Sequence, residues 1–464
     1  MLGGWPLLDL VELAFRELAL FAAFGFLLGA LDNLTIDMLW IRRMIRRALG
    51  RPDATRRVLT DLPPPAAPGR HAIFIPAWDE ADVIRAMLES TVWRFAGQDY
   101  TLFVGCYPND LETMTEIETV AHRAANIRMA ICSDPGPTTK ADCLNRLWRA
   151  MRDEEDRADL RFKSIVLHDA EDVVHPSEIA LFDRLIEHHD LVQIPVVPLP
   201  HPRSRWVAGH YCDEFAEAHG KDLVIRDSLG AGVPSAGVGC AIARSTLGTL
   251  AEERDGAPFD AGSLTEDYEL GLSLAERGRN GTFMRCHDAA SGELIAVQAH
   301  FPATLGEAVR QKTRWIAGIA LYGWERLGWH SGGADLWMRI RDRSTILAAL
   351  VLLTAYLAAI LAFGLLIAAS TTNYSLPAIP PILAIALSIN FALLLWRLAM
   401  RALFTGFTYG WREALLAVPR TVISNIIAII AARRAMTHYI LARRDHPPAW
   451  DKTRHIFPET ATPE

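Results

Sequence analysis

The sequence predicts an α/β domain with a mostly parallel, doubly wound sheet, flanked by membrane-spanning helices. Between residues 71 and 329, short apolar runs of strand length alternate with stretches of helical periodicity, which is typical of parallel strands joined by crossover helices. Long apolar runs lie on both sides of this region. Hydrophobic residues make up 51% of the 464 residues and the mean hydropathy is +0.14, which is high for a soluble enzyme and agrees with membrane segments.

The first apolar segment covers residues 10–41, and it reaches the roughly 20 residues of a membrane span if the helix continues past Asp32 and Asp37. We therefore predict an N-terminal transmembrane helix within residues 1–41. The stretch at 42–69 is first arginine-rich and then proline-rich, which indicates a basic juxtamembrane segment and a stiff linker. By the positive-inside tendency these arginines are cytoplasmic, so the amino terminus is expected outside.

Two later apolar runs, at 346–369 and 377–398, are each long enough to cross roughly 30 Å of hydrocarbon. A short polar turn separates them, so residues 331–401 are predicted to form a transmembrane hairpin. The last apolar patch, 422–432, is too short to span and is bracketed by arginines. We expect an amphipathic helix at the cytoplasmic interface, within a tail of residues 402–464.

The region between the spans, residues 70–330, is predicted to lie in the cytoplasm. Its strand-like runs and helical patterns are at 72–75, 100–105, 127–132, 165–167 and 191–197, and at 82–94, 111–125 and 141–152. The six cysteines have no metal-ligand spacing and are expected to be reduced thiols. The arginine clusters lie beside apolar segments and no RNA or DNA motif accompanies them, so the lipid bilayer is the expected partner and nucleic acid is not.

An acidic cluster follows the apolar strand at 165–167. Asp169, Glu171 and Asp172 fall where this strand ends, and ligands of open α/β sheets bind just outside the carboxyl ends of strands. Hard oxygen ligands held close together suit a divalent cation that carries a diphosphate. A single acidic turn is more often a solvated surface feature, so the prediction depends on the motifs that accompany it.

Three other motifs follow strand ends. Pro76 and Glu80 lie where the first strand meets a helix, a place suited to holding a nucleoside. Asp110 follows the second strand and is suited to accept from the imide N–H of uracil. Lys140 lies beside the crevice and suits a diphosphate. Taken singly, these are a helix start, a turn and a solvated lysine.

Two motifs lie further along the chain. Thr265 is a good helix N-cap, and Asp267, two residues later, is a candidate general base that takes a proton from an attacking hydroxyl. Gln311, Arg314 and Trp315 then place an amide, a guanidinium and an indole along one turn of a helix. Arg314 suits a developing diphosphate charge and Trp315 offers a flat face to a sugar ring, although a Trp/Arg belt at a membrane interface has the same composition.

The order of these motifs resembles that of the membrane-bound glycosyltransferase family 2 synthases, which include cellulose, hyaluronan and related exopolysaccharide synthases. The set runs Pro-Ala-Trp-Asp-Glu, Asn-Asp, Lys-to-Asn, Asp-Ala-Glu-Asp, Thr-Glu-Asp and Gln-x-x-Arg-Trp across residues 70–330. Each motif is weak alone, but six in one order are specific. The runs at 168–176 and 448–453 look most like the bacterial phage-adsorption-protein-B type of these glycosyltransferases.

The resemblance implies a GT-A-type nucleotide-sugar-binding domain, a UDP-sugar donor and Mg²⁺ or Mn²⁺ as cofactor. The implied nucleotide-sugar-binding residues are Pro76, Glu80, Asp110, Lys140, Asp169, Gln311 and Arg314. The implied acceptor-binding residues are Glu266 and Trp315, and the implied metal ligands are Asp169, Glu171 and Asp172. The family's usual Asp-x-Asp is here Asp169-Ala-Glu171, which leaves open whether Glu171 or Asp172 touches the metal.

By the same resemblance, Asp267 and Arg314 are the catalytic residues of an inverting transfer to a growing polysaccharide at a bacterial inner membrane. Single-sugar transfer to a lipid carrier is an alternative, as is an inactive scaffold or receptor subunit for exopolysaccharide export. About three spans are few to enclose a polymer channel, so an oligomer or an outer-membrane export partner is expected. Residues 450–453 fit a lid over the nucleotide pocket and a packed surface tail equally well.

Overall fold

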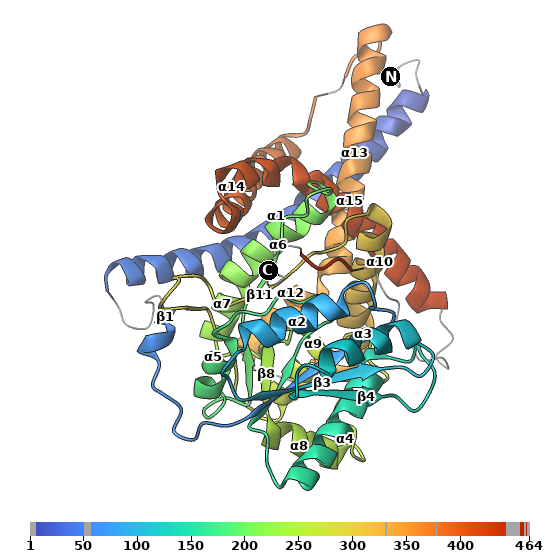
Figure 1. The fold of residues 1–464 in the computed structure, drawn as a ribbon. Coiled ribbons are helices and arrows are strands. Elements are labelled where there is room, and N and C mark those ends of the chain that lie inside the picture. The colour runs from blue at the N-terminus through green and yellow to red at the C-terminus, as the bar shows by residue number, and fades with distance from the viewer. Residues whose placement is uncertain are drawn as a thin grey trace.

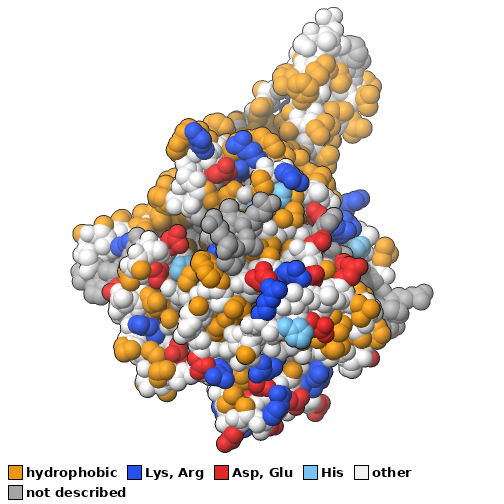
Figure 2. All heavy atoms as spheres, in the orientation of Figure 1, with side chains coloured by type: hydrophobic (Ala, Val, Ile, Leu, Met, Phe, Trp, Pro, Cys, Tyr) orange, Lys and Arg blue, Asp and Glu red, His pale blue; other side chains and the backbone are white. Residues whose placement is uncertain are grey.

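The computed structural model describes residues 6–50, 57–329, 332–376, 378–441, 455–458 and 461. Figure 1 shows an α/β region in its lower part and a group of long helices that rises above it. In Figure 2, charged side chains gather over the α/β region, whereas the projecting helical end carries mostly hydrophobic ones.

A seven-stranded sheet forms the centre of the α/β region, in the order β4-β3-β2-β5-β8-β6-β9. Its strands are β2 (His71–Pro76), β3 (Tyr100–Cys106), β4 (Ile127–Ile131), β5 (Ser164–Leu167), β6 (Leu191–Gln193), β8 (Cys240–Ala243) and β9 (Gly281–Phe283). All neighbours run parallel except β8, which is antiparallel to β5 and β6. The mostly parallel sheet is confirmed, and the reversed strand makes it mixed.

The predicted strand at 191–197 is divided between two sheets. After β6 the chain breaks at Ile194 and Pro195, and β7 (Val196–Pro198) pairs instead with β11 (Val297–Ala299). A proline cannot donate a ladder hydrogen bond, which accounts for the break. A second small sheet joins β1 (Arg57–Val58) to β10 (Cys286–His287).

Two helical layers bury the two faces of the sheet. Successive residues of β2 point to opposite faces, so Ile73 and Ile75 belong to one apolar core while Ala72 and Phe74 belong to the other. The helices of the α/β region are α2 (Ile84–Arg94), α3 (Leu111–Ala121), α4 (Lys140–Ala158), α5 (Glu178–Leu185), α8 (Arg244–Glu253) and α9 (Glu266–Glu276). Burial on both faces explains why the strand sequences are apolar throughout.

Among the described residues, four helices are long and apolar enough to cross a membrane. They are α1 (Pro6–Ala48), α13 (Thr345–Thr371), α14 (Pro381–Tyr409) and α15 (Trp411–Leu441). The first predicted span lies inside α1, and the predicted hairpin corresponds to α13 and α14, preceded by the short α12 (Gly333–Arg343). The placement of these helices relative to a bilayer stays a prediction.

The prediction that the last apolar patch is too short to span was wrong about length. The patch at 422–432 is the middle of α15, which has 31 residues. Arg420 of this helix is buried and contacts the α/β region: its Nη1 lies 3.2 Å from Asp213 Oδ1 of α6 (Val207–Glu217), and its Nε donates to the carbonyl of Arg205 at 2.6 Å. This contact ties the first part of α15 to the α/β region, and the interfacial position of the helix stays a prediction.

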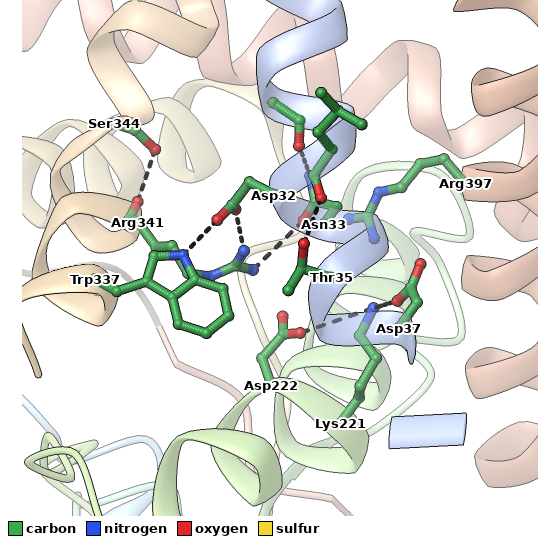
Figure 3. A network of polar contacts seen from close by, with 12 residues as sticks. Asp32, Asn33, Thr35, Asp37, Lys221, Asp222, Trp337, Arg341, Ser344 and Arg397 are labelled. Atoms are coloured by element: carbon green, nitrogen blue, oxygen red, sulfur yellow. Dashed lines mark hydrogen bonds and ion pairs between the residues drawn. The ribbon is translucent and has the colours of Figure 1, made fainter. Parts of the chain in front are cut away.

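Polar side chains join α1 to the α/β region where the apolar segment is interrupted. Lys221 Nζ lies 2.5 Å from Asp37 Oδ1 of α1 (Figure 3). The same Nζ lies 2.7 Å from Glu217 Oε1 of α6. Arg397 of α14 makes an ion pair with the same Glu217. Both Asp37 and Lys221 are almost fully buried, so these charges neutralise one another away from water.

The second interrupting carboxylate, Asp32, points toward α12 in Figure 3. It accepts from Trp337 Nε1 at 2.7 Å and pairs with Arg341. Six ionised residues therefore form what we call the junction network: Asp32, Asp37, Glu217, Lys221, Arg341 and Arg397.

Candidate active site

The carboxyl ends of β2, β3 and β5 lie side by side at one edge of the sheet. Glu80, Asp110 and Asp169 follow these three strands, so parallel pairing brings them to the same edge, as predicted. Because β8 runs the other way, Cys240 at its start lies opposite Leu167 at the end of β5. The loop before β8 is thereby brought to this edge as well.

Lys140 connects the two acidic motifs. It is the first residue of α4, and its Nζ lies 2.6 Å from Asp169 Oδ1. Burial lowers the pKa of this ammonium, but the carboxylates of Asp169, Glu266 and Asp267 outweigh burial and raise it above its ordinary value. A permanent positive charge thus lies between the Asp-Ala-Glu-Asp turn and the Thr-Glu-Asp motif.

Glu171 meets Glu80 and a histidine from the far end of the chain. His455 Nδ1 lies 2.9 Å from Glu80 Oε1 and 3.2 Å from Glu171 Oε2. Burial, together with the charges of Asp169, Glu80 and Asp172, raises the pKa of Glu171 to about 8, although His455 opposes this.

The chemistry of this group fits a divalent cation. One ligand atom from each of Glu80, Glu171 and His455 lies within 4.8 Å of the others. Glu171 Oε2 is buried, and its contact with His455 is an ion pair without hydrogen-bond geometry, so it has coordination capacity to spare. Carboxylate oxygens suit Mg²⁺ and Mn²⁺, and an imidazole suits transition metals. Of the predicted metal ligands, Glu171 fits this site best. Asp169 lies nearby and makes an ion pair with Lys140.

His455 was not among the predicted site residues. The nearest prediction was for residues 450–453, as a lid or a packed surface tail. That stretch lies outside the described residues. A lone histidine 284 residues after Glu171 has no spacing pattern that links it to a metal site. The motif Trp-Asp-Lys-Thr at 450–453 was the nearest available signal, two positions before His455.

Asp172 does not join the other predicted metal ligands. Its Oδ2 accepts from the Asp169 amide at 2.9 Å and lies 3.0 Å from His168 Nδ1, while His168 Nε2 lies 2.7 Å from Glu178 Oε1. Burial lowers the pKa of His168, but Glu178 and Asp172 together raise it to about 10. The imidazolium of His168 thus lies between the carboxylates of Asp172 and Glu178 and stabilises the Asp-Ala-Glu-Asp turn. Asp172 therefore has a structural role in this turn.

Asp110 has backbone partners. One of its carboxylate oxygens accepts from the Asp79 amide at 2.5 Å and the other from the Thr113 amide at 3.3 Å. It is therefore the N-cap of α3 and also fixes the loop that carries Glu80. The Pro76 end of β2 leads into the same loop. Recognition of uracil by Asp110 stays a prediction.

Asp267 opens α9 within reach of the lysine. Its Oδ1 accepts from the Tyr268 amide at 2.7 Å, and a Cβ added to Gly237 would lie 2.5 Å from its Oδ2. Gly237 has φ +75, so a side chain there is doubly disfavoured. Burial raises the pKa of Asp267, while Lys140 and Arg314 lower it. Burial and Asp267 raise the pKa of Glu266 to about 7.

Thr265 precedes α9 at the predicted N-cap position, but its side chain makes no capping hydrogen bond. The capping prediction was wrong because the side chain turns toward η4 (Ala317–Tyr322): a Cβ on Gly318 would lie 2.5 Å from Thr265 Oγ1. That hydroxyl is buried without a hydrogen-bond partner. The contact packs the Thr-Glu-Asp motif against the end of α10 (Leu305–Ile316).

The Gln-x-x-Arg-Trp motif lies on α10. Arg314 lies near enough to Glu266 and Asp267 for its charge to lower the pKa values of both carboxyls. Gln311 Oε1 is buried with no hydrogen-bond partner. Trp315 packs among aromatic rings, with centroids 6.2 Å from Tyr211 and 6.3 Å from Phe215. Its role in acceptor binding stays a prediction.

A pocket of about 540 Å³ lies beside α4, between the loop after β4 and residues 254–261. Asn145 of the lysine motif and Phe259 both line this pocket. Asn145 Nδ2 donates to the Phe259 carbonyl at 2.8 Å, and Asn145 Oδ1 accepts from the Phe259 amide at 3.0 Å. This clamp fixes the loop that leads into the Thr-Glu-Asp motif, which gives the motif's asparagine a structural role.

Comparison with known proteins agrees with this geometry. The sequence profile described as "Glycosyltransferase like family 2" matches residues 68–318. The chain is 35% identical over 466 residues to bacteriophage adsorption protein B of Escherichia coli strain K12 and to bacteriophage N4 adsorption protein B of Escherichia coli O157:H7. These matches cover 96% of this chain but 62% of the relatives, so the chain spans only part of their length.

Among solved structures, the mannosyltransferase PcManGT from Pyrobaculum calidifontis, in complex with GDP-Man and Mn²⁺, aligns with a TM-score of 0.52. The alignment is 15% identical and covers 88% of this chain and 99% of that protein. It supports the predicted GT-A-like α/β fold, here with a mixed sheet. The chain belongs to glycosyltransferase family 2.

Proposed function

We propose that the chain is an inverting membrane glycosyltransferase that transfers a sugar from a nucleotide sugar, with a UDP-sugar as expected donor, to a growing polysaccharide. The observation that carries this proposal is the position of Lys140. It makes an ion pair with Asp169, and the charges of Glu266 and Asp267 raise its pKa, so motifs nearly a hundred residues apart lie around one lysine. A nucleotide-binding motif and a candidate base meet there.

Asp267 is proposed as the general base. Burial raises the pKa of its carboxyl, which prepares it to accept the proton of an acceptor hydroxyl. The hydroxyl oxygen then forms a bond to the anomeric carbon as the bond to the nucleoside diphosphate breaks. A single displacement of this kind inverts the anomeric configuration, because no covalent bond to the enzyme forms.

The departing diphosphate needs positive charge, and the cleft supplies it from two elements. Lys140 comes from α4 and Arg314 from α10, and fixed charges at the place where negative charge develops are a large contribution to catalysis. Glu171 with Glu80 and His455, and Asp169 beside them, would hold Mg²⁺ or Mn²⁺. Such an ion, when bound, supplies further positive charge to the diphosphate.

The membrane helices support placement of the cleft at the cytoplasmic face of a bacterial inner membrane. Arginines cluster at the C-terminal end of α1, which favours a cytoplasmic position for the α/β region that follows. Few helices are available to enclose a polymer channel. We therefore expect an oligomer or an outer-membrane export partner if the product is a secreted polymer.

Purified chain in detergent, supplied with Mn²⁺ and a panel of UDP-sugars, tests the proposal. We expect release of UDP together with a polymer whose new linkage is inverted relative to the donor, as read by NMR. A single sugar on a lipid carrier would replace the polymerase proposal by the alternative transfer. A folded chain that releases no nucleotide from any donor, GDP-sugars included, would favour the inactive scaffold.

A further inference from the structure

The described end of the chain lies on α2. Phe457 and Ala461 are only 8% and 6% exposed, and they belong to the same apolar core as Ile84, Met87 and Leu88 of that helix. Ser90 donates its hydroxyl hydrogen to the Ala461 carbonyl at 2.8 Å. These contacts are apolar and backbone contacts that have no chemical role of their own.

His455 lies two positions before Phe457 and is the only described tail residue that makes ion pairs with Glu80 and Glu171. Its ring lies between Glu80 and Glu171, although His455 is 375 positions after Glu80 in the sequence. An unanchored tail would lose much conformational freedom each time it brought this ring to the carboxylates. An anchored tail has lost that freedom in advance, which favours metal binding.

We propose that Phe457, with Ala461 and Ser90, is a positioning anchor that fixes His455 at the cation site and thereby sets the affinity of that site for a divalent metal. The inference rests on the proposed metal site and concerns how a segment remote from the chemistry controls it. Phe457 acts only through His455. A loss of the anchor frees the ring, weakens metal binding, and leaves Glu80 and Glu171 in place in the loops that follow β2 and β5.

The test measures Mn²⁺ binding to the full chain in detergent without donor, by the electron paramagnetic resonance signal of free Mn²⁺. Phe457→Ala is expected to raise the Kd for Mn²⁺ about tenfold, the order seen when a residue that orients a metal ligand is removed. Phe457→Leu, which keeps an apolar side chain, is expected to restore most of the affinity. Ser90→Ala removes one hydrogen bond to Ala461 and weakens binding less, in the same direction.

A double-mutant cycle separates positioning from general damage. With His455→Ala already present, Phe457→Ala should cause no further loss, because the anchor has no ring left to position. Trp93→Ala is the matched control, since this aromatic residue lies on the same helix but is 58% exposed and should leave the Kd unchanged.

Three outcomes overturn the proposal. A wild-type Kd for Mn²⁺ in Phe457→Ala would refute the positioning role of Phe457 and leave the metal site standing. Equal losses from Phe457→Ala with and without His455 would show a general structural effect. If the wild-type chain binds no Mn²⁺, both the cation site and the positioning role of Phe457 are refuted. A failure of sugar transfer alone would refute the proposed function and leave the Mn²⁺-binding results unchanged.

Discussion

Two groups of buried charge in this molecule have opposite character. In the junction network, each carboxylate has a cation at ion-pair distance, and Lys221 and Arg397 both contact Glu217. In the acidic cleft, formed by Glu80, Asp169, Glu171, Glu266 and Asp267, acids outnumber bases. Within the described part of the chain, neither Glu266 nor Asp267 makes an ion pair of 4.0 Å or less.

The pKa values record this difference. Burial raises the pKa of Glu217, but Arg397, Lys221 and Arg401 outweigh burial and lower it to about 2. In the cleft, burial and like charges act together, raising the pKa of Glu171 to about 8 and that of Glu266 to about 7. Matched charges hold helices together, whereas unmatched acids are available to a ligand, a cation or a proton.

The largest expected effect comes from removing the proposed base. Asp267→Asn should lower kcat by up to about 10⁴-fold, because the amide cannot take the acceptor proton. The free energy of unfolding should hold or increase, since an unmatched buried acid is removed. Initial rates of UDP release and thermal unfolding in detergent measure the two quantities. Asp153→Asn, on an exposed turn of α4, is the control, and full activity in Asp267→Asn would remove the mechanism.

Removing the central cation of the junction network should act on stability. Lys221→Met leaves Asp37 and Glu217 buried without it, so the free energy of unfolding should fall by about 3–5 kcal/mol. Arg85→Met breaks an exposed pair with Glu116 and should cost less than about 1 kcal/mol. Urea unfolding followed by tryptophan fluorescence compares them. Equal losses would show that the junction network is not the stabilising feature inferred here.

The corresponding lysine of the cleft should behave in the opposite way. Lys140→Met is expected to lower kcat by about 10²–10³-fold, the order found when one stabilising donor is lost. Its effect on stability should be smaller than that of Lys221→Met, because Asp169 keeps 32% of its side-chain surface exposed and water solvates it. Both measurements on one preparation, with the Arg85→Met control, decide the comparison. A larger loss of stability than of rate would reverse it.

The smallest expected effect is a pH dependence of stability. The pKa of Glu171 is raised from an ordinary 4.5 to about 8, so between these values the folded chain retains a proton that the unfolded chain loses. Stability from this group should therefore be full below pH 4.5 and fall as the pH rises toward 8. Thermal unfolding across this range should show a shallower decline for Glu171→Gln. Mn²⁺, which binds the carboxylate form, should diminish the difference between the two chains, and identical profiles without metal would contradict the assigned shift.

Local sequence patterns predicted most of the α/β region. Apolar runs at 72–75, 100–105 and 165–167 are β2, β3 and β5, because strands buried on both faces leave an unmistakable composition. The order of the motifs was enough to indicate the family. The reversal of β8 left no such trace, since an antiparallel strand buried on both faces has the same composition as a parallel one.

The cleft was predicted less completely than the sheet. Asp169, Glu171 and Asp267 follow or begin regular elements, so their positions could be inferred from strand ends and helix starts. Asp172 turned out to support its own turn through His168, and Thr265 packs on Gly318 without capping α9. Both differences arise because the contacts of a short polar side chain depend on residues that are close to it in the fold. The sequence pattern around Asp172 or Thr265 does not identify these residues.

The amino-acid sequence by itself determined the alternation of strands and helices, the apolar segments and the acids at the strand ends, since each is set by neighbours a few positions away. Only the tertiary structure decided which acids remain unmatched and which are neutralised. Lys221 reaches Asp37 across 184 positions, and His455 reaches Glu80 across 375. The state of a buried charge depends on distance in space and on exclusion of water, and both are properties of the folded chain.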